Sequence, residues 1–217
     1  MKYDPNKHHR RSIRLKGYDY HNAGAYFITI CTMNRVCVLE DPIVNSIIND
    51  VWLALPLWFP TIELDEFIIM PNHVHFVVWL GVGTPLAGVL PTNAGVLNAQ
   101  EDGGKPRPYA IPSPQKTNTN PTLGDFVGAF KSLVFKTYFN WIQTNNVPTQ
   151  AKFWQANYYE HIIRNDRELN AIRQYIIENP SNWQTDRDNL NNINQLPPPS
   201  KMEDYLEELY ELMGWKS

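Results

Sequence analysis

The chain has 217 residues, which suits one compact domain with additional segments, and it contains no run of about eighteen apolar residues that would suggest a membrane span. Hydrophobic residues (43%) and aromatic residues (12%) suffice for a buried core, while the net charge of −3 by itself argues mildly against a nucleic-acid partner. The two cysteines and the charged, non-apolar start predict neither a disulfide framework nor a secretory signal, and therefore a cytoplasmic protein.

The charge is unevenly distributed along the chain. Residues 1–17 carry six basic side chains against Asp4, a charge of +5, whereas residues 201–217 carry two basic and five acidic side chains, a charge of −3. We predict a basic N-terminal arm over residues 1–20 that suits phosphate groups. Two solvated chain ends would show the same pattern, so charge alone leaves both interpretations open.

The first half of the chain alternates strand and helix patterns. The stretch 24–32 is rich in β-branched and aromatic residues and predicts a buried strand. Apolar residues at helical spacing predict a helix over 42–56, with Asp41 as its N-cap. Residues 62–70 and 73–80 predict two further strands joined by a turn at Pro71-Asn72.

The second half begins with a change of composition. Residues 81–121 are rich in Gly, Pro, Thr and Asn and lack hydrophobic periodicity, which predicts a long mobile insertion rather than a domain. A helix is expected from Thr122, and a fourth strand with its approach over 153–163. A last core helix is expected over 166–179, with Asp166 as its N-cap and Asn179-Pro180 as its end.

The order β-α-β-β-α-β-α predicts an α+β fold. We expect a ferredoxin-like sandwich with one antiparallel four-stranded sheet and helices on one face, plus the long loop insertion and a C-terminal helix. The predicted divisions are the basic arm (1–20), the main domain (21–185), and a linker with an acidic C-terminal helix (186–217). Within the last part, a Pro-rich stretch at 196–199 precedes the helix, expected at about 202–213.

A histidine pair on the third predicted strand is a candidate metal site. In a strand, residues two apart project from the same face, so His73 and His75 stand side by side while Val74 faces the other way. Two neutral imidazoles can share one ion, and a third group, often an oxygen donor for Mg²⁺ or Mn²⁺, usually completes the set. Spacing alone does not separate a metal site from a catalytic or a structural pair.

The last core helix offers two further polar groups. Tyr175 and Asn179 are four residues apart and so lie on one helix face, one turn from each other. One interpretation is structural, with Tyr175 in the core and Asn179 ending the helix. The other places Asn179 on a metal and Tyr175 beside it as a nucleophile. A tyrosine hydroxyl is a poor nucleophile near its free pKa of about 10, and a metal that polarises the scissile phosphate would reduce the activation it needs.

Six strings in order along the chain resemble those of the REP-associated tyrosine transposases, a branch of the single-tyrosine HUH transposases related to the insertion-sequence "200-like" group. The similarity runs from about Arg10 to Trp183 and leaves out the insertion. A histidine pair alone would be weak evidence, but six strings on the expected elements are specific. The strings are Arg11–Tyr20, Gly24–Thr32, Met70–His75, Phe153–Gln155, Tyr158–Arg164 and Tyr175–Pro180.

This resemblance implies an enzyme that cuts single-stranded DNA. His73 and His75 would be the HUH pair, Asn179 the third ligand of a divalent metal (Mg²⁺ or Mn²⁺), and Tyr175 the nucleophile that forms a 5′-phosphotyrosine and frees a 3′-hydroxyl. The insertion-sequence relatives usually have Gln where Asn179 lies, whereas the REP-associated branch resembles this chain in having Asn. The implied substrates are imperfect palindromic hairpins in single-stranded DNA with a short flanking guide, and the implied process is DNA transposition.

Further residues are assigned supporting roles. We predict that Glu160 and His161 orient the site, unless they are an ordinary polar pair at a strand end. Arginine and lysine in the arm would neutralise phosphates, and tyrosines would stack on splayed bases. The predicted DNA-binding residues are Arg10, Arg11, Arg14, Lys16, Tyr18 and Tyr20.

Two other functions stay open at this point. A domesticated DNA-hairpin-binding protein without cleavage would keep the fold, and a metal-dependent hydrolase acting on another substrate would keep the histidines. The presence of all four site residues and of the basic arm favours the enzyme acting on DNA. Related proteins act as monomers or homodimers, and both states remain possible. The acidic C-terminal helix would either cover its own domain or support a dimer.

Overall fold

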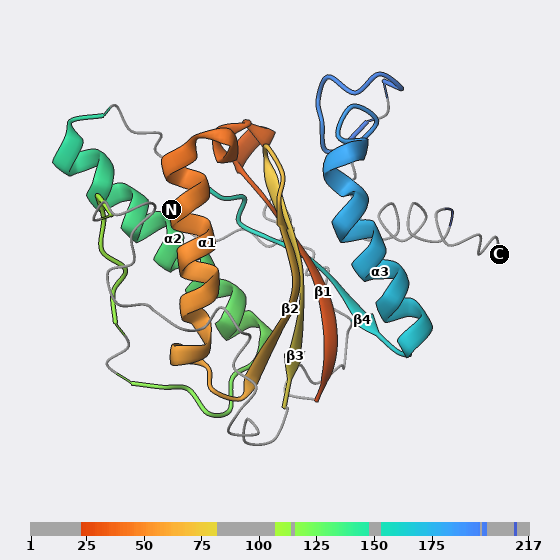
Figure 1. Cartoon of the computed structure of the whole chain (residues 1–217), viewed down its shortest axis with the longest axis horizontal. Coiled ribbons are helices and arrows are strands. Elements are labelled where there is room, and N and C mark those ends of the chain that lie inside the picture. Colours follow the sequence, from red (N-terminus) through yellow and green to blue (C-terminus); the bar gives the residue numbers. More distant parts are fainter. Residues whose placement is uncertain are drawn as a thin grey trace, which may run out of the picture.

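Four antiparallel strands form one sheet with the order β2-β3-β1-β4 in the computed structural model, which describes residues 23–81, 107–113, 116–147, 153–195, 197–198 and 211 (Figure 1). The strands are β1 (Gly24–Cys31), β2 (Ile62–Ile69), β3 (His73–Leu80) and β4 (Tyr159–Ile163). The helices are α1 (Pro42–Trp58), α2 (Leu123–Asn145) and α3 (Asp166–Glu178). The predicted α+β, ferredoxin-like arrangement with one antiparallel four-stranded sheet is thereby confirmed.

Local sequence explains where the helices begin. The Asp41 carboxylate accepts hydrogen bonds from the backbone of Ile43 and Val44 at the start of α1. Thr122 and Asp125 form a reciprocal capping box at the start of α2. The side chain of Asn165, rather than that of the expected Asp166, caps α3 by accepting from the backbone N–H of Glu168. Helix α1 also continues through Pro56, two residues beyond its predicted end.

The register of the sheet divides its residues between two covered faces. Tyr26, Ile28 and Phe76 point to the face that α1 and α2 cover, and they belong to the larger core cluster. Phe27 and Val77 point to the opposite face, where a smaller cluster packs against α3. Figure 1 shows α1 and α2 on one side of the sheet and α3 on the other.

The prediction that the helices lie on one face is therefore wrong for α3. The reason that a helix covers each face lies in β1, whose consecutive residues Tyr26, Phe27 and Ile28 are all fully buried. A strand that is apolar at successive positions has to be covered on both faces, whereas a half-solvated strand alternates. Helix α3 covers the second face of the sheet.

Residues 107–113 and 116–121, the described part of the predicted insertion, form no helix or strand but pack onto the domain. Tyr109 donates a hydrogen bond of 2.7 Å to Asp50 on α1 and contacts the Ser46 hydroxyl at 2.6 Å. Tyr109 and Ile111 also pack against the larger core. The domain thus includes the end of the insertion, while residues 82–106 lie outside the described residues.

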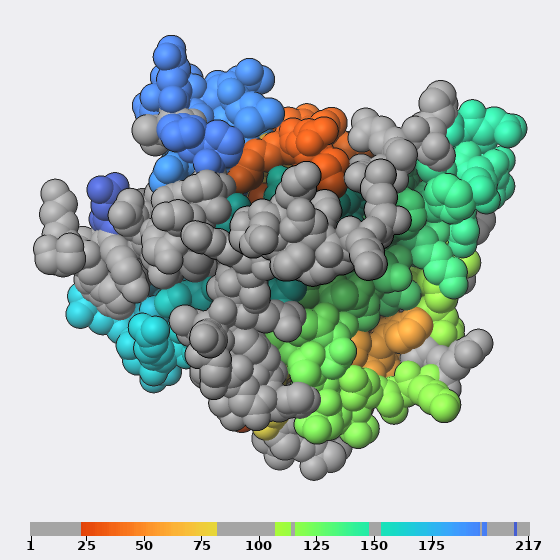
Figure 2. All heavy atoms as spheres, turned by 180° about the vertical axis from the view of Figure 1, so that it is seen from behind, coloured from red at the N-terminus to blue at the C-terminus, as the bar shows by residue number. Residues whose placement is uncertain are grey.

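The described chain also continues in packed form past residue 185, where the linker was predicted to begin. Asp188 is 1% exposed and Asn192 is 6% exposed. In the space-filling view from behind, the residues after α3 (blue) form a projection beside the turns that follow β1 (orange) (Figure 2). The predicted C-terminal helix lies, apart from Glu211, outside the described residues. No helix in the described part of the chain is long and apolar enough to cross a membrane.

Candidate active site

The two histidines of β3 meet on the face of the sheet that α3 covers. His73 and His75 are both fully buried, and their Nε2 atoms are 2.9 Å apart. Burial lowers the pKa of His75 to about 3. Burial, followed by the charges of His75 and Arg35, lowers the pKa of His73 well below 6.5. Both imidazoles are therefore neutral at pH 7, the state in which a histidine nitrogen binds a metal.

Asn72 fixes the tautomer of His73. Its amide nitrogen donates to the backbone oxygens of Arg35 (3.1 Å) and Asp188 (2.7 Å), so its Oδ1 is the atom that faces His73 Nδ1 at 2.8 Å. His73 must therefore carry its proton on Nδ1, which leaves a lone pair on Nε2. Asn72 is fully buried, so water does not compete for these bonds.

The Thr29 hydroxyl lies 2.8 Å from His75 Nδ1 and can donate or accept. Without a metal, His75 donates its Nε2 proton to His73 Nε2, and Thr29 donates to His75 Nδ1. When the His75 proton lies on Nδ1 instead and the Thr29 hydroxyl accepts a hydrogen bond from it, the Nε2 atoms of His73 and His75 both carry free lone pairs. The pair can therefore switch between a hydrogen bond and a two-nitrogen cation site without any change in charge.

Tyr175 approaches this pair from α3 of the same chain. Its hydroxyl is 3.5 Å from His75 Nε2, and its ring lies edge-on to Phe27 at a centroid distance of 6.0 Å. The side chain is 9% exposed. The tyrosine thus meets both earlier interpretations, since its ring packs in the smaller core while its hydroxyl reaches the histidines.

Asn179, one helical turn after Tyr175, presents an unpaired oxygen. The residue is 3% exposed, and its Oδ1 is buried without a hydrogen-bond partner among the described residues. Its amide nitrogen donates to the carboxylate of Asp186. A buried carbonyl oxygen without a donor costs free energy, about 1–3 kcal/mol, unless a cation or a water occupies its lone pairs.

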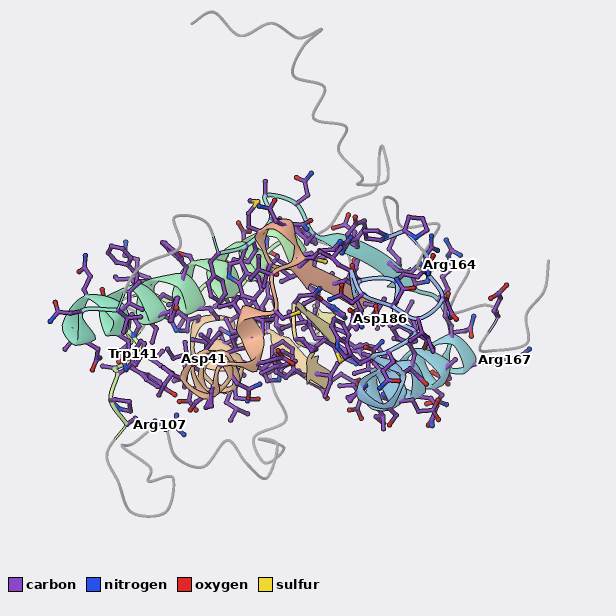
Figure 3. The ribbon with its side chains drawn as sticks, turned by 90° about the horizontal axis from the view of Figure 1, so that it is seen from above. Asp41, Arg107, Trp141, Arg164, Arg167 and Asp186 are labelled. Atoms are coloured by element: carbon purple, nitrogen blue, oxygen red, sulfur yellow. The ribbon has the colours of Figure 1, made fainter. Side chains whose placement is uncertain are left out.

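Asp186 and Asp188 extend the site from the segment after α3. One nitrogen of His73 and one carboxylate oxygen from each aspartate lie within 4.8 Å of one another. Burial raises the pKa of Asp186 to about 6, although the hydrogen bond from Asn179 and the charge of Arg35 act in the opposite direction. Figure 3 shows Asp186 between the sheet and α3, with Arg164 and Arg167 at the outer edge.

Asp188 is held by a buried ion pair. Its carboxylate contacts the guanidinium of Arg35, and the two side chains are 1% and 9% exposed. The Arg35 guanidinium also donates to Cys31 Sγ at 3.5 Å. Both Asn34 and Arg35 adopt the left-handed conformation, with φ of 56° and 53°, which costs energy in a non-glycine residue. The ion pair fixes the segment after α3 against the end of β1.

The donor set fits a divalent cation. Two imidazole nitrogens, one amide oxygen and nearby carboxylates are ligands that Mn²⁺ accepts, and the oxygen donors also suit Mg²⁺. His73, His75 and Asn179 would hold the ion, with Asp186 and Asp188 close by.

Comparisons with known proteins give one close relative. No family model matches the chain. An uncharacterized protein of Haemophilus influenzae is 35% identical over 194 residues, which cover 86% of this chain and 96% of that protein. The chain belongs to the same family as this Haemophilus protein. The two members of this family thus match over nearly the whole length of the relative.

Two solved structures share a more distant likeness with this member of the family. A REP-associated tyrosine transposase bound to a REP hairpin has a TM-score of 0.42 and 16% identity, covering 94% of this chain and 92% of that one. A candidate transposase from Deinococcus radiodurans has a TM-score of 0.37 and 18% identity, covering 77% and 96%. At these TM-scores the likeness carries no argument about function, which has to come from the chain's own residues.

The structure does not bring every predicted residue to the site. Glu160 pairs with Ile28 and so points to the α1/α2 face, away from the histidines. His161 lies on the α3 face, but its Nε2 bonds Glu168 at 2.7 Å, at the start of α3. Among the contacts described for this part of the chain, neither side chain bonds His73 or His75, so the orienting role of this pair stays a prediction. The predicted DNA-binding residues of the arm lie outside the described residues.

Asn72, Thr29 and Asp186 were missed as site residues. Asn72 had a signal, because it directly precedes the histidine pair, but it was interpreted only as a turn residue. Thr29 is one of several β-branched residues in β1, and only the register with His75 distinguishes it. Asp186 and Asp188 form an Asp-Arg-Asp sequence whose alternation suggests ligands, but they stood in a predicted linker.

Proposed function

We propose that this protein is a metal-dependent DNA strand transferase of the tyrosine HUH type, which cuts single-stranded DNA through a covalent 5′-phosphotyrosine and acts in DNA transposition. The observation that supports the proposal is the approach of the Tyr175 hydroxyl to His75 Nε2 within one chain, although Tyr175 stands 100 residues after His75. His73 lies beside His75, and Asn179 follows Tyr175 by one helical turn. These are the four residues that the six matching strings assign to the reaction. A structural tyrosine would not require a neutral histidine pair beside its hydroxyl.

The chain's own groups suit this reaction. A bound divalent metal would neutralise charge on the scissile phosphate and orient the leaving oxygen. Burial keeps His73 and His75 neutral. The hydrogen bond to Asn72 keeps the proton of His73 on Nδ1, so that the lone pair of Nε2 is available to a metal. Asn179 supplies its unpaired Oδ1.

Tyr175 would attack the phosphorus of a phosphodiester. The bond from Tyr175 Oη to phosphorus forms, the bond from phosphorus to the 3′ oxygen breaks, and the tyrosine proton lost to solvent balances the proton that the 3′ oxygen gains. The phosphotyrosine keeps the energy of the broken bond, so the reverse attack by a 3′-hydroxyl rejoins DNA. Because the tyrosine and the histidine of this contact belong to the same chain, we propose that one protomer is sufficient for the reaction.

The proposed partner is single-stranded DNA that folds into a hairpin. The basic arm, with Arg10, Arg11, Arg14 and Lys16, is proposed to contact phosphates, and Tyr18 and Tyr20 to stack on bases. Charge neutralisation of this kind predicts that binding weakens with rising salt concentration.

The decisive experiment compares two tyrosines. Tyr175→Phe removes only the nucleophilic oxygen, so cleavage of labelled hairpin oligonucleotides with Mn²⁺ should fall by about a thousandfold or more, with no covalent adduct, while hairpin binding stays within about twofold. Tyr159→Phe is the matched control, because Tyr159 pairs with Thr29 beside the histidines, and it should retain cleavage. Undiminished cleavage by Tyr175→Phe would exclude Tyr175 as the nucleophile. Binding without any adduct in the wild type would favour the non-cleaving hairpin-binding protein.

A further inference from the structure

We infer that Asp186 is the positioning residue for Asn179: its carboxylate holds the Asn179 amide nitrogen, so that Oδ1 is turned toward the histidine pair as a metal ligand. This inference rests on the metal site of the proposed function and assigns a role to a residue outside the six matching strings.

The amide of Asn179 has two possible orientations, which exchange its oxygen and its nitrogen. A carboxylate accepts hydrogen bonds and cannot donate them at neutral pH, so the group that faces Asp186 must be the NH₂. The oxygen is then forced to the other side, where it lies buried without a partner among the described residues. Without Asp186, either orientation would be open.

Burial makes this constraint strong. Asn179 is 3% exposed, so water does not offer its amide group alternative partners. The carboxylate itself is held in place, because Asp186 Oδ1 accepts from the backbone N–H of Asp188 at 2.6 Å. Asp188 is in turn fixed by Arg35. A chain of contacts from β1 to the segment after α3 therefore sets the direction of one ligand atom.

The position of Asp186 beside the ligands supports a role in the site rather than in the fold alone. A carboxylate oxygen of Asp186 lies within 4.8 Å of a nitrogen of His73. Hydrogen-bond partners of metal ligands typically change metal affinity by about 10–100-fold when removed.

The test measures Mn²⁺ binding to the metal-free full-length protein by titration calorimetry, without DNA. Asp186→Ala should weaken binding by about tenfold or more, whereas Asp186→Asn, whose oxygen can still accept from Asn179, should stay within about threefold of the wild type. Asp166→Ala removes an exposed carboxylate from the far end of α3 and is the matched control, with no expected change. Thermal unfolding in metal-free buffer verifies that each variant is folded.

A double-mutant cycle separates positioning from direct ligation. If Asp186 acts through Asn179, adding Asp186→Ala to Asn179→Ala should not weaken Mn²⁺ binding further. Equal loss in Asp186→Ala and Asp186→Asn, or additive losses in the double variant, would overturn the inference in favour of a direct ligand. Unchanged affinity in Asp186→Ala would overturn it outright. Absence of Mn²⁺ binding in the wild type would instead overturn the metal site of the proposed function, and the inference with it.

Discussion

The two faces of the sheet differ in what they bury. The face under α1 and α2 holds a large apolar cluster in which Phe76 contacts the rings of Trp52, Phe67, Phe126 and Phe130 at centroid distances of 5.0 to 6.5 Å. The face under α3 holds a cluster of eight buried residues, and at one end of it lie neutral histidines, an amide and carboxylates.

This difference separates stability from chemistry within one sheet. The first face gains free energy from apolar burial, which is roughly proportional to the area removed from water. The second face buries polar groups at a cost, which the hydrogen bonds among them offset in part. We therefore expect substitutions on the first face to change folding and substitutions on the second to change function.

The largest expected contrast lies in two adjacent residues of β3. Phe76→Ala should lower the free energy of unfolding by about 3–5 kcal/mol, because it leaves a cavity among four rings. His75→Ala should lower it by about 2 kcal/mol or less and yet reduce metal-dependent cleavage by about a thousandfold or more. Urea unfolding and hairpin cleavage measure the two effects. A His75→Ala variant that unfolds as easily as Phe76→Ala would contradict the division between the faces.

The next effect concerns the ion pair that fixes the segment after α3. Arg35→Ala should cost about 3–5 kcal/mol, because it leaves the carboxylate of Asp188 buried without its guanidinium. The double variant Arg35→Met/Asp188→Leu should recover most of this loss, since it removes both charges. Urea unfolding of the two single variants and the double variant gives the coupling energy. Equal losses in Arg35→Ala and the double variant would show that the pair has no special role.

The smallest expected effect is at the joint between β2 and α3. Burial alone raises the pKa of Asp65, but hydrogen bonds from Arg173, Trp79 and the Glu66 backbone lower it below 3.8 overall. The stabilisation from this pair is therefore present above about pH 4 and is lost as the pH falls through the lowered value.

Arg173→Ala should remove this contribution, about 1 kcal/mol at pH 7, because the Arg173 side chain is 36% exposed and its charge is partly screened. The variant and the wild type should converge in stability below the folded pKa of Asp65. Urea unfolding between pH 2 and pH 7 measures the difference. A difference that persists at the lowest pH would assign the effect to packing of the Arg173 stem rather than to charge.

Local patterns in the sequence determined most of the fold. Periodicity and capping residues placed the seven α-helices and strands within a few residues, and β4 begins at Tyr159, inside the range predicted for the fourth strand and its approach. In the approach to this strand, Trp154 forms an isolated bridge with Thr32.

The sequence by itself determined the histidine pair, since a period of two along a strand requires that His73 and His75 share a face. It also placed Tyr175 and Asn179 on one helix face, because residues four apart meet every turn. Only the tertiary structure decided that this helix covers the face to which the histidines point, that Glu160 lies on the other face, and that Asp186 returns to the site. Those relations join residues up to 113 positions apart, as His73 and Asp186 are, and packing of two sheet faces rather than any local rule fixes them.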